Sequence, residues 1–180
     1  MSSLSPSPQV WSAETEAHAQ AVAAFATAAR GMPISRWQQP IARGKWSPAE
    51  ITAHVAEVYA VVRREIAGGA GMQMRGSAFG RWVLRRTVLP FLLRGKPFPP
   101  GARAPVETRP VTVLADQAAA VAALEKAAHQ FVVELLERQA AGPLWLTHAY
   151  FGRGSALDGL RLVTAHTRHH AQQLVRACGS

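Results

Sequence analysis

Four long segments of this sequence repeat apolar residues at the three- and four-residue spacing of an amphipathic helix. Glycine or proline follows the first three of them and ends the pattern. Since no segment alternates with period two for long enough to predict a strand, we expect an all-α protein, a four-helix bundle. The four helices are expected at Trp11–Arg30, from Ser47 to the Gly68–Gly69 pair, at Asp116–Gln139 and at Ser155–Ala177.

Two of these helices carry clear start signals. Ser47 is followed by Pro48 and, three residues after the serine, by Glu50. This pattern predicts an N-cap, a proline in the first helical position and the acid that closes a capping box. Ser155 and Asp158 repeat the pattern before the last helix. The two helices that carry the histidines considered below therefore have well-defined starts.

A link of about 45 residues separates the second helix from the third, far longer than the usual helix connection. We expect a short extra helix over Phe79–Leu89, ended near Pro90, and then a proline-rich run. A link of this length can cross the bundle, so the second and third helices need not be adjacent antiparallel neighbours. The expected organisation is a flexible N-terminus over residues 1–10 and a single domain over residues 11–180.

Charge is concentrated in this link. Lys and Arg number 20 against 11 acids, a net charge of +9. Seven of these nine charges come from the segment 75–110, which contains one acid, Glu107. Such a segment can attract nucleic acid, anionic lipid or acidic small molecules, or it can be solvated surface charge. Its basic residues are Arg75, Arg81, Arg85, Arg86, Arg94, Lys96, Arg103 and Arg109.

Targeting and redox signals are absent from the sequence. Its one cysteine, Cys178, cannot form an internal disulfide, so nothing points to an oxidising compartment. The Ser/Pro-rich start, Met1–Pro8, lacks the basic and apolar regions of a signal peptide. The longest apolar stretch, Thr87–Leu93, is too short to span a membrane. We therefore expect a cytoplasmic protein.

Three histidines lie on the apolar faces of the second and fourth helices. His166 and His170 are four residues apart, so both imidazoles lie on one face and can bind one metal ion. His54 lies on the apolar stripe of the second helix and supplies a third ligand. Three protein ligands leave a coordination position open, as in catalytic sites. A histidine on an apolar stripe can instead be a core residue with a satisfied hydrogen bond, but burying three together without a metal is costly.

Two stretches around these histidines resemble the motifs of the DinB/YfiT-like superfamily. Gly44–Val55 is similar to the second-helix motif, in which Trp-Ser is followed by a histidine seven residues after the serine. His166–Leu174 is similar to the last-helix motif, His-x-x-x-His-x-x-Gln. The turn 149–152 resembles the family's Pro-x-Phe-Gly, with Ala149 in place of proline. The resemblance covers most of the chain.

This resemblance implies a four-helix bundle with a crossover link, a homodimer, and metal ligands at His54, His166 and His170. It also implies that Gln173, which matches the family's glutamine, holds the ligands in place without contacting the metal itself. Otherwise Gln173 makes a helix–helix hydrogen bond with no role in chemistry. Three imidazoles suit zinc, nickel, iron or copper, and zinc and nickel are our first choices. His18, His129 and His148 are not expected to be ligands.

The resemblance also suggests a function class, because similar proteins include small-thiol S-transferases, maleylpyruvate isomerases and domains of sulfoxide synthases. We expect a metal-dependent enzyme, either a small-thiol S-transferase or a hydrolase, acting on a small-molecule thiol or electrophile. Arg81, Arg85 and Arg86 are candidates to bind an anionic group of the substrate. The alternative is a non-enzymatic module that docks on nucleic acid or an anionic membrane through segment 75–110, although neither partner is expected. The sequence does not identify the substrate.

Overall fold

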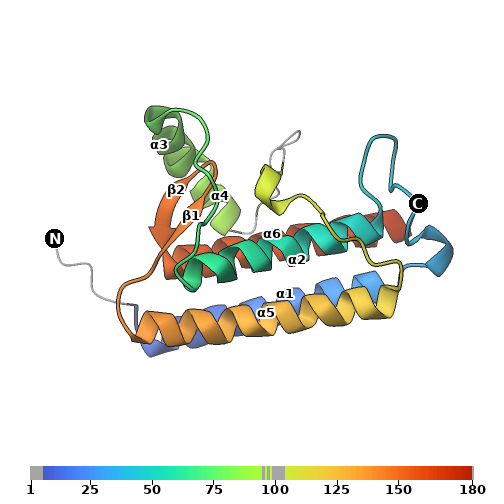
Figure 1. Ribbon diagram of the computed structural model, residues 1–180, viewed down its shortest axis with the longest axis horizontal. Coiled ribbons are helices and arrows are strands. Elements are labelled where there is room, and N and C mark those ends of the chain that lie inside the picture. The colour runs from blue at the N-terminus through green and yellow to red at the C-terminus, as the bar shows by residue number, and fades with distance from the viewer. Residues whose placement is uncertain (1–5, 95, 97, 99–103, 180) are drawn as a thin grey trace.

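A computed structural model describes residues 6–94, 96, 98 and 104–179 and shows a four-helix bundle with a small β-hairpin at one end (Figure 1). The long link carries two short helices, α3 (Ala78–Thr87) and α4 (Leu89–Leu93), and two 3-10 turns, η1 (Ile34–Arg36) and η2 (Val106–Thr108), lie in the loops. The expected all-α class is confirmed, with the hairpin as a minor addition. The bundle helices are α1 (Pro8–Arg30), α2 (Pro48–Ile66), α5 (Gln117–Ala140) and α6 (Ala156–Cys178).

Both serines cap their helices as expected, and the capping box at Ser47 is complete. Ser47 Oγ accepts the backbone N–H of Glu50 at 3.2 Å, and the Glu50 carboxylate accepts the N–H of Ser47 at 2.7 Å. Ser155 Oγ accepts the N–H of Asp158 at 3.1 Å. Helix α1 begins at Pro8, earlier than expected, so only part of the segment 1–10 precedes the helix. Residues 1–5 lie outside the described residues.

The four helices of the bundle form two pairs, and the two helices of each pair run parallel. Helices α1 and α6 lie side by side, and so do α2 and α5 (Figure 1). Contacts between α1 and α6 advance together along both helices: Glu14 binds Arg161 at 2.7 Å near their starts, and the Cys178 thiol faces the Gly31 carbonyl at their ends. The α2–α5 pair also runs parallel, and the two pairs are antiparallel to each other. The expected crossover link is therefore confirmed, since it returns the chain to start α5 beside the start of α2.

A polar network lies inside the core of the bundle. Thr164 Oγ donates to the carbonyl of its own helix, so it accepts the Nδ1–H of His18 at 3.1 Å. The Tyr59 hydroxyl bonds Thr167 Oγ at 2.9 Å. Burial lowers the pKa of His18 to about 4, so this ring is a neutral core residue. The largest fully buried apolar side chains of the main core are Trp37, Phe25, Phe131, Ile51, Leu124, Leu135, Leu160 and Leu174.

The sequence predicted one extra helix in the link, and the structure has two short helices there. These are α3 (Ala78–Thr87) and α4 (Leu89–Leu93), with Val88 between them. Pro90 lies in the first turn of α4, where a backbone N–H is not needed, so it starts a helix instead of ending one. The buried side chains of α4 pack on the bundle, whereas α3 has no buried residue and projects away from it (Figure 1).

The β-hairpin was not expected from the sequence. Strands β1 (Trp145–His148) and β2 (Gly152–Ser155) pair antiparallel just before α6. Gly152 has φ of 72°, a left-handed conformation that favours glycine in the turn. The Glu65 carboxylate accepts the Thr147 N–H at 2.9 Å and its hydroxyl at 2.6 Å. These bonds hold the hairpin against the end of α2.

No helix in the described part of the chain is both long enough and apolar enough to cross a bilayer.

Candidate metal centre

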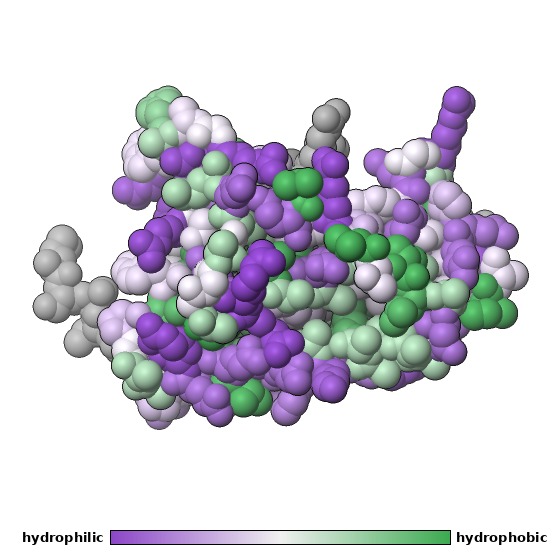
Figure 2. Space-filling model, viewed as in Figure 1, coloured by the Kyte–Doolittle hydropathy of each residue, from purple (hydrophilic) through white to green (hydrophobic). Residues whose placement is uncertain are grey.

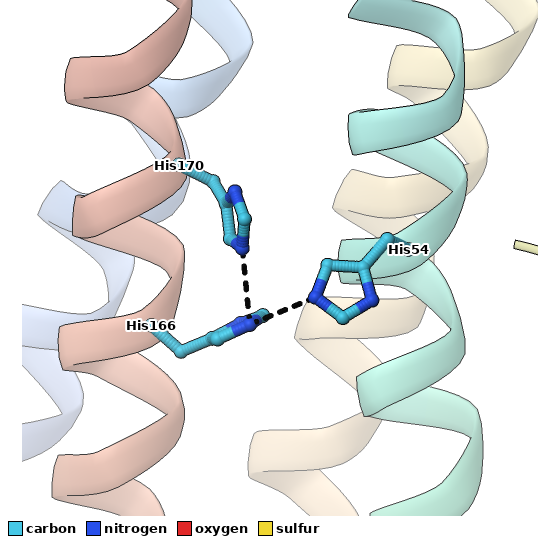
Figure 3. Close-up of side chains that lie close together, drawn as sticks. All are labelled: His54, His166 and His170. Atoms are coloured by element: carbon cyan, nitrogen blue, oxygen red, sulfur yellow. Dashed lines mark hydrogen bonds between the residues drawn. The ribbon is translucent and has the colours of Figure 1, made fainter. Parts of the chain in front are cut away.

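The three histidines singled out in the sequence meet at one point between α2 and α6 (Figure 3). The Nε2 atom of His166 lies 3.0 Å from that of His54 and 3.1 Å from that of His170. Their potential ligand atoms all lie within 4.8 Å of one another. Within the described part of the chain, no other trio of His, Cys, Asp or Glu side chains converges in this way.

Two carbonyl oxygens fix the tautomers of the outer rings. His54 Nδ1 lies 2.5 Å from the backbone oxygen of Thr108, and His170 Nδ1 lies 2.9 Å from Oε1 of Gln173. Because these oxygens can only accept, both Nδ1 atoms carry the proton and both Nε2 atoms present a lone pair. Gln173 therefore bonds one of the three histidines, and its supporting role stays a prediction. Thr108 is a contact of His54 that the sequence did not reveal.

A bound cation would explain the short contacts between the ring nitrogens. The Nε2 atom of His166 can offer at most one proton to two facing lone pairs, so at least one of the two short contacts sets lone pair against lone pair. Ligand nitrogens about 2.1 Å from a tetrahedral zinc ion lie about 3.4 Å apart, close to the spacing here. The donor set therefore fits a divalent ion bound by three imidazoles.

Burial keeps all three rings neutral. His54 is 3% exposed and His170 is 8% exposed. Desolvation lowers the pKa of His170 to about 3 and also lowers the pKa of His54. The pKa of His166 falls well below its usual value, because of burial first and then the charges of the surrounding imidazoles. Neutral imidazoles are the form that binds metal, so protons do not compete for the site near pH 7.

Aromatic rings surround the triad. The Trp46 ring lies 4.7 Å from that of His54, measured between centroids. Phe98 meets His166 edge to face at 5.9 Å and lies 5.1 Å from His169. His169 thus lies at the edge of the site. These rings limit the access of water to the ligands.

The triad lies in the wall of a cavity of about 1150 Å³. Besides His169, a further histidine, His148, lines the same cavity from the end of β1. Its ring stacks on Phe151 at 4.6 Å, and its Nδ1 accepts the N–H of Tyr150 at 3.2 Å. Its Nε2 therefore carries a proton, and burial lowers its pKa to about 4. From the sequence, His148 was not counted among the site residues, and its position beside the family-like turn 149–152 was the signal that could have found it.

Only one of the three arginines proposed to bind a substrate anion lines the cavity. That one, Arg85, donates to the backbone carbonyl of Arg153 and lies 3.9 Å from the Asp158 carboxylate. Arg81 donates to the Gly76 carbonyl at 2.6 Å, and Arg86 lies over the ring of Trp82. Anion binding by these residues stays a prediction. The structure places two other cations, Lys45 and Arg109, in the cavity lining.

Comparison with known proteins places the chain in a family. The family model of the DinB superfamily matches residues 17–174, so this chain belongs to the DinB superfamily. No curated protein matches the sequence. One similar solved structure is that of YfiT from Bacillus subtilis, described as "a probable metal-dependent hydrolase with an unusual four-helix bundle topology". The TM-score is 0.59 at 14% identity, over 99% of this chain and 93% of that one, which shows a shared fold.

Metal binding can be tested by elemental analysis of untagged protein after dialysis against zinc. We expect about one ion per chain, and loss of most of it in His54→Ala, His166→Ala and His170→Ala, since each removes one of three ligands. Gln173→Leu should weaken zinc binding about 10- to 100-fold, because the His170 ring loses its orienting bond.

The matched control is His129→Ala on the exposed side of α5, which should retain the ion. Wild-type protein without bound metal, or equal loss in His129→Ala, would contradict the assignment.

The lowered pKa values also predict how stability depends on pH. In the metal-free protein, unfolded histidines take up protons below pH 6.5, whereas folded His148 and His170 stay neutral to about pH 4 and 3. The unfolded state thus binds more protons than the folded state below pH 6.5. The free energy of unfolding is therefore highest above pH 6.5 and falls as the pH drops towards 4 and 3. Each such histidine contributes a slope of up to about 1.4 kcal/mol per pH unit.

Urea unfolding at pH 7, 6 and 5 measures this slope. His148→Gln should flatten it, and His129→Gln on the surface should leave it unchanged. An unfolding free energy that stays constant between pH 7 and 5 would show that the buried rings are not held neutral.

Proposed function

We propose that this member of the DinB superfamily is a metal-dependent enzyme, a hydrolase or a small-thiol S-transferase, with His54, His166 and His170 as ligands of one divalent ion. The observation that carries this proposal is the set of Nε2 atoms facing one another at 3.0 and 3.1 Å in a cavity wall. Zinc or nickel is the proposed ion, since both suit imidazole ligands. The proposal includes a cytoplasmic location and a homodimer, although one chain supplies all three ligands.

The side chains around the triad have separable roles in this proposal. When bound, a divalent ion lowers the pKa of a water or thiol that shares its coordination sphere and polarises a carbonyl oxygen. Thr108 and Gln173 hold two ligand rings in the tautomer that binds metal. His148 supplies an Nε2–H to the cavity, which can hydrogen-bond to an oxygen of a substrate. Trp46 and Phe98 keep the ligands dry and so strengthen these polar interactions.

The two reaction classes differ in what attacks the substrate. In hydrolysis, water is the nucleophile, and the description of YfiT supports this class by its fold likeness. In S-transfer, a thiolate is the nucleophile, and metal binding raises its fraction at neutral pH. The cavity volume of about 1150 Å³ is large enough for a small thiol together with an electrophile.

Two assays of the zinc- or nickel-loaded protein separate these classes. One follows the release of nitrophenolate from an aryl ester, and the other follows conjugation of a chloronitrobenzene with cysteine or another small thiol. We expect one of the two rates to depend on metal and to fall by about 100-fold or more in His170→Ala, because the ion is lost.

His129→Ala is the control and should keep the wild-type rate. Both rates remaining unchanged after chelation of the metal, or in the His170→Ala protein, would refute the enzymatic proposal.

A second candidate function, docking on an anionic membrane, rests on the exposed face of α3 and α4. Phe79, Trp82 and Phe91 are 73%, 55% and 54% exposed, and the first two rings stack at 6.0 Å. Figure 2 shows apolar atoms at the outer tip of the α3 projection beside hydrophilic side chains. Basic residues on α3, Arg81, Arg85 and Arg86, supply positive charge. Other apolar residues of this segment, Leu89 and Leu92, are buried against the bundle.

Sedimentation with vesicles tests this second candidate. Vesicles containing phosphatidylserine should carry the protein down, and those of phosphatidylcholine alone should not, because the basic residues are attracted to anionic headgroups. The double variant Phe79→Ser and Trp82→Ser should lose binding. Ile34→Ser, which removes a 69% exposed residue in the 3-10 turn η1, should retain it. No sedimentation with either vesicle type would exclude docking on membranes.

A further inference from the structure

The cavity around the triad has one apolar end. Side chains from α3, α4, the hairpin and the first half of α6 line it and pack against one another. Leu162 in this group lies one helical turn before His166, so the apolar wall leads directly to the ligands. The group contains Leu84, Val88, Leu89, Leu92, Phe151 and Leu162.

The opposite end of the cavity carries two cations. Lys45 precedes Trp46, whose ring packs on His54, and Arg109 follows Thr108, whose carbonyl bonds His54. Both cations line the cavity and both are exposed. In the described part of the chain, neither forms an ion pair with a carboxylate. Their charge is therefore available to a ligand.

The acids in the cavity lining do not cancel this charge. Glu50 closes the capping box of α2, where its carboxylate accepts the N–H of Ser47 at 2.7 Å next to the positive end of the helix dipole. Asp158 faces Arg85 at 3.9 Å beside the hairpin, on the apolar side of the triad. The end of the cavity near His54 therefore has a positive field.

The triad lies between these two ends. His54 is near the start of α2, beside the segments that carry Lys45 and Arg109, whereas α3, α4 and the hairpin meet the bundle at the far end of α2 (Figure 1). The middle of a ligand that filled the cavity would thus lie against the three imidazoles.

We propose that the cavity binds an amphipathic anion. Its apolar group of several carbon atoms lies against α4 and the hairpin, and its anionic group lies between Lys45 and Arg109. The part of the inference that places the reacting bond at the triad rests on the proposed function. The binding preference itself rests on the cavity alone.

Titration calorimetry of the full chain tests the preference with three probes: octanoate, butanoate and 1-octanol. Metal-free protein is used first, so that a carboxylate cannot bind through the ion. Each buried methylene contributes about 0.8 kcal/mol, roughly a fourfold gain in affinity, so octanoate should bind at least tenfold more tightly than butanoate. Octanoate should also bind about tenfold more tightly than 1-octanol, because its charge is paired with the two cations.

Variants assign each preference to its end of the cavity. Lys45→Gln together with Arg109→Gln should equalise octanoate and 1-octanol. Arg43→Gln, an exposed cation of the same loop outside the cavity lining, is the matched control and should change nothing. Leu84→Asn, in the apolar wall, should reduce the advantage of octanoate over butanoate.

Equal affinity for octanoate and 1-octanol in the wild type would overturn the anionic part, and equal affinity for octanoate and butanoate would overturn the apolar part. Binding at the level of butanoate for every probe would overturn the whole inference. Failure of the proposed function looks different: zinc is then not bound, or chelation leaves both reaction rates unchanged, while the probe affinities keep their order.

Discussion

The convergence of three neutral imidazoles is the interaction on which the rest of the structure depends. Two Nε2 atoms 3.0–3.1 Å apart repel each other when their lone pairs face, unless a cation or a proton lies between them. The fold must therefore hold α2 and α6 firmly at this level. The network of His18, Tyr59 and Thr167 does so directly behind the triad, because it joins α1, α2 and α6 through buried hydrogen bonds one residue away from His166.

The sequence predicted those parts of the site that local geometry determines. A spacing of four residues put His166 and His170 on one helix face, and the capping box at Ser47 set the phase of the helix that carries His54. The contact between the two helices was not local, and it came from the family resemblance together with the apolar stripes. The fold class and the crossover link followed from the same periodicity and from the length of the link.

Features that depend on the path of the link could not be predicted. Thr108 supports His54 across 54 positions of sequence, and no pattern around it indicates a contact with a histidine. The hairpin has strands of four residues, and Gly152 and Gly154 in β2 hide any alternation. His148 therefore reached the cavity through a turn that periodicity cannot detect. The charge of the link was recognised, but Arg81 and Arg85 bind backbone carbonyls, which composition does not reveal.

The parallel pairing of α1 with α6 has a consequence for synthesis of the chain. In an up-and-down bundle, each helix can pack on the one made just before it, so apolar faces are covered as the chain grows. Here α1 finds its main neighbour in the last helix to be made. The part of its apolar face that packs on α6 stays uncovered until that helix has left the ribosome, and closing so long a loop makes folding slower than in a bundle with local contacts. The topology that builds the site therefore leaves apolar surface exposed for longer during synthesis than an up-and-down bundle would.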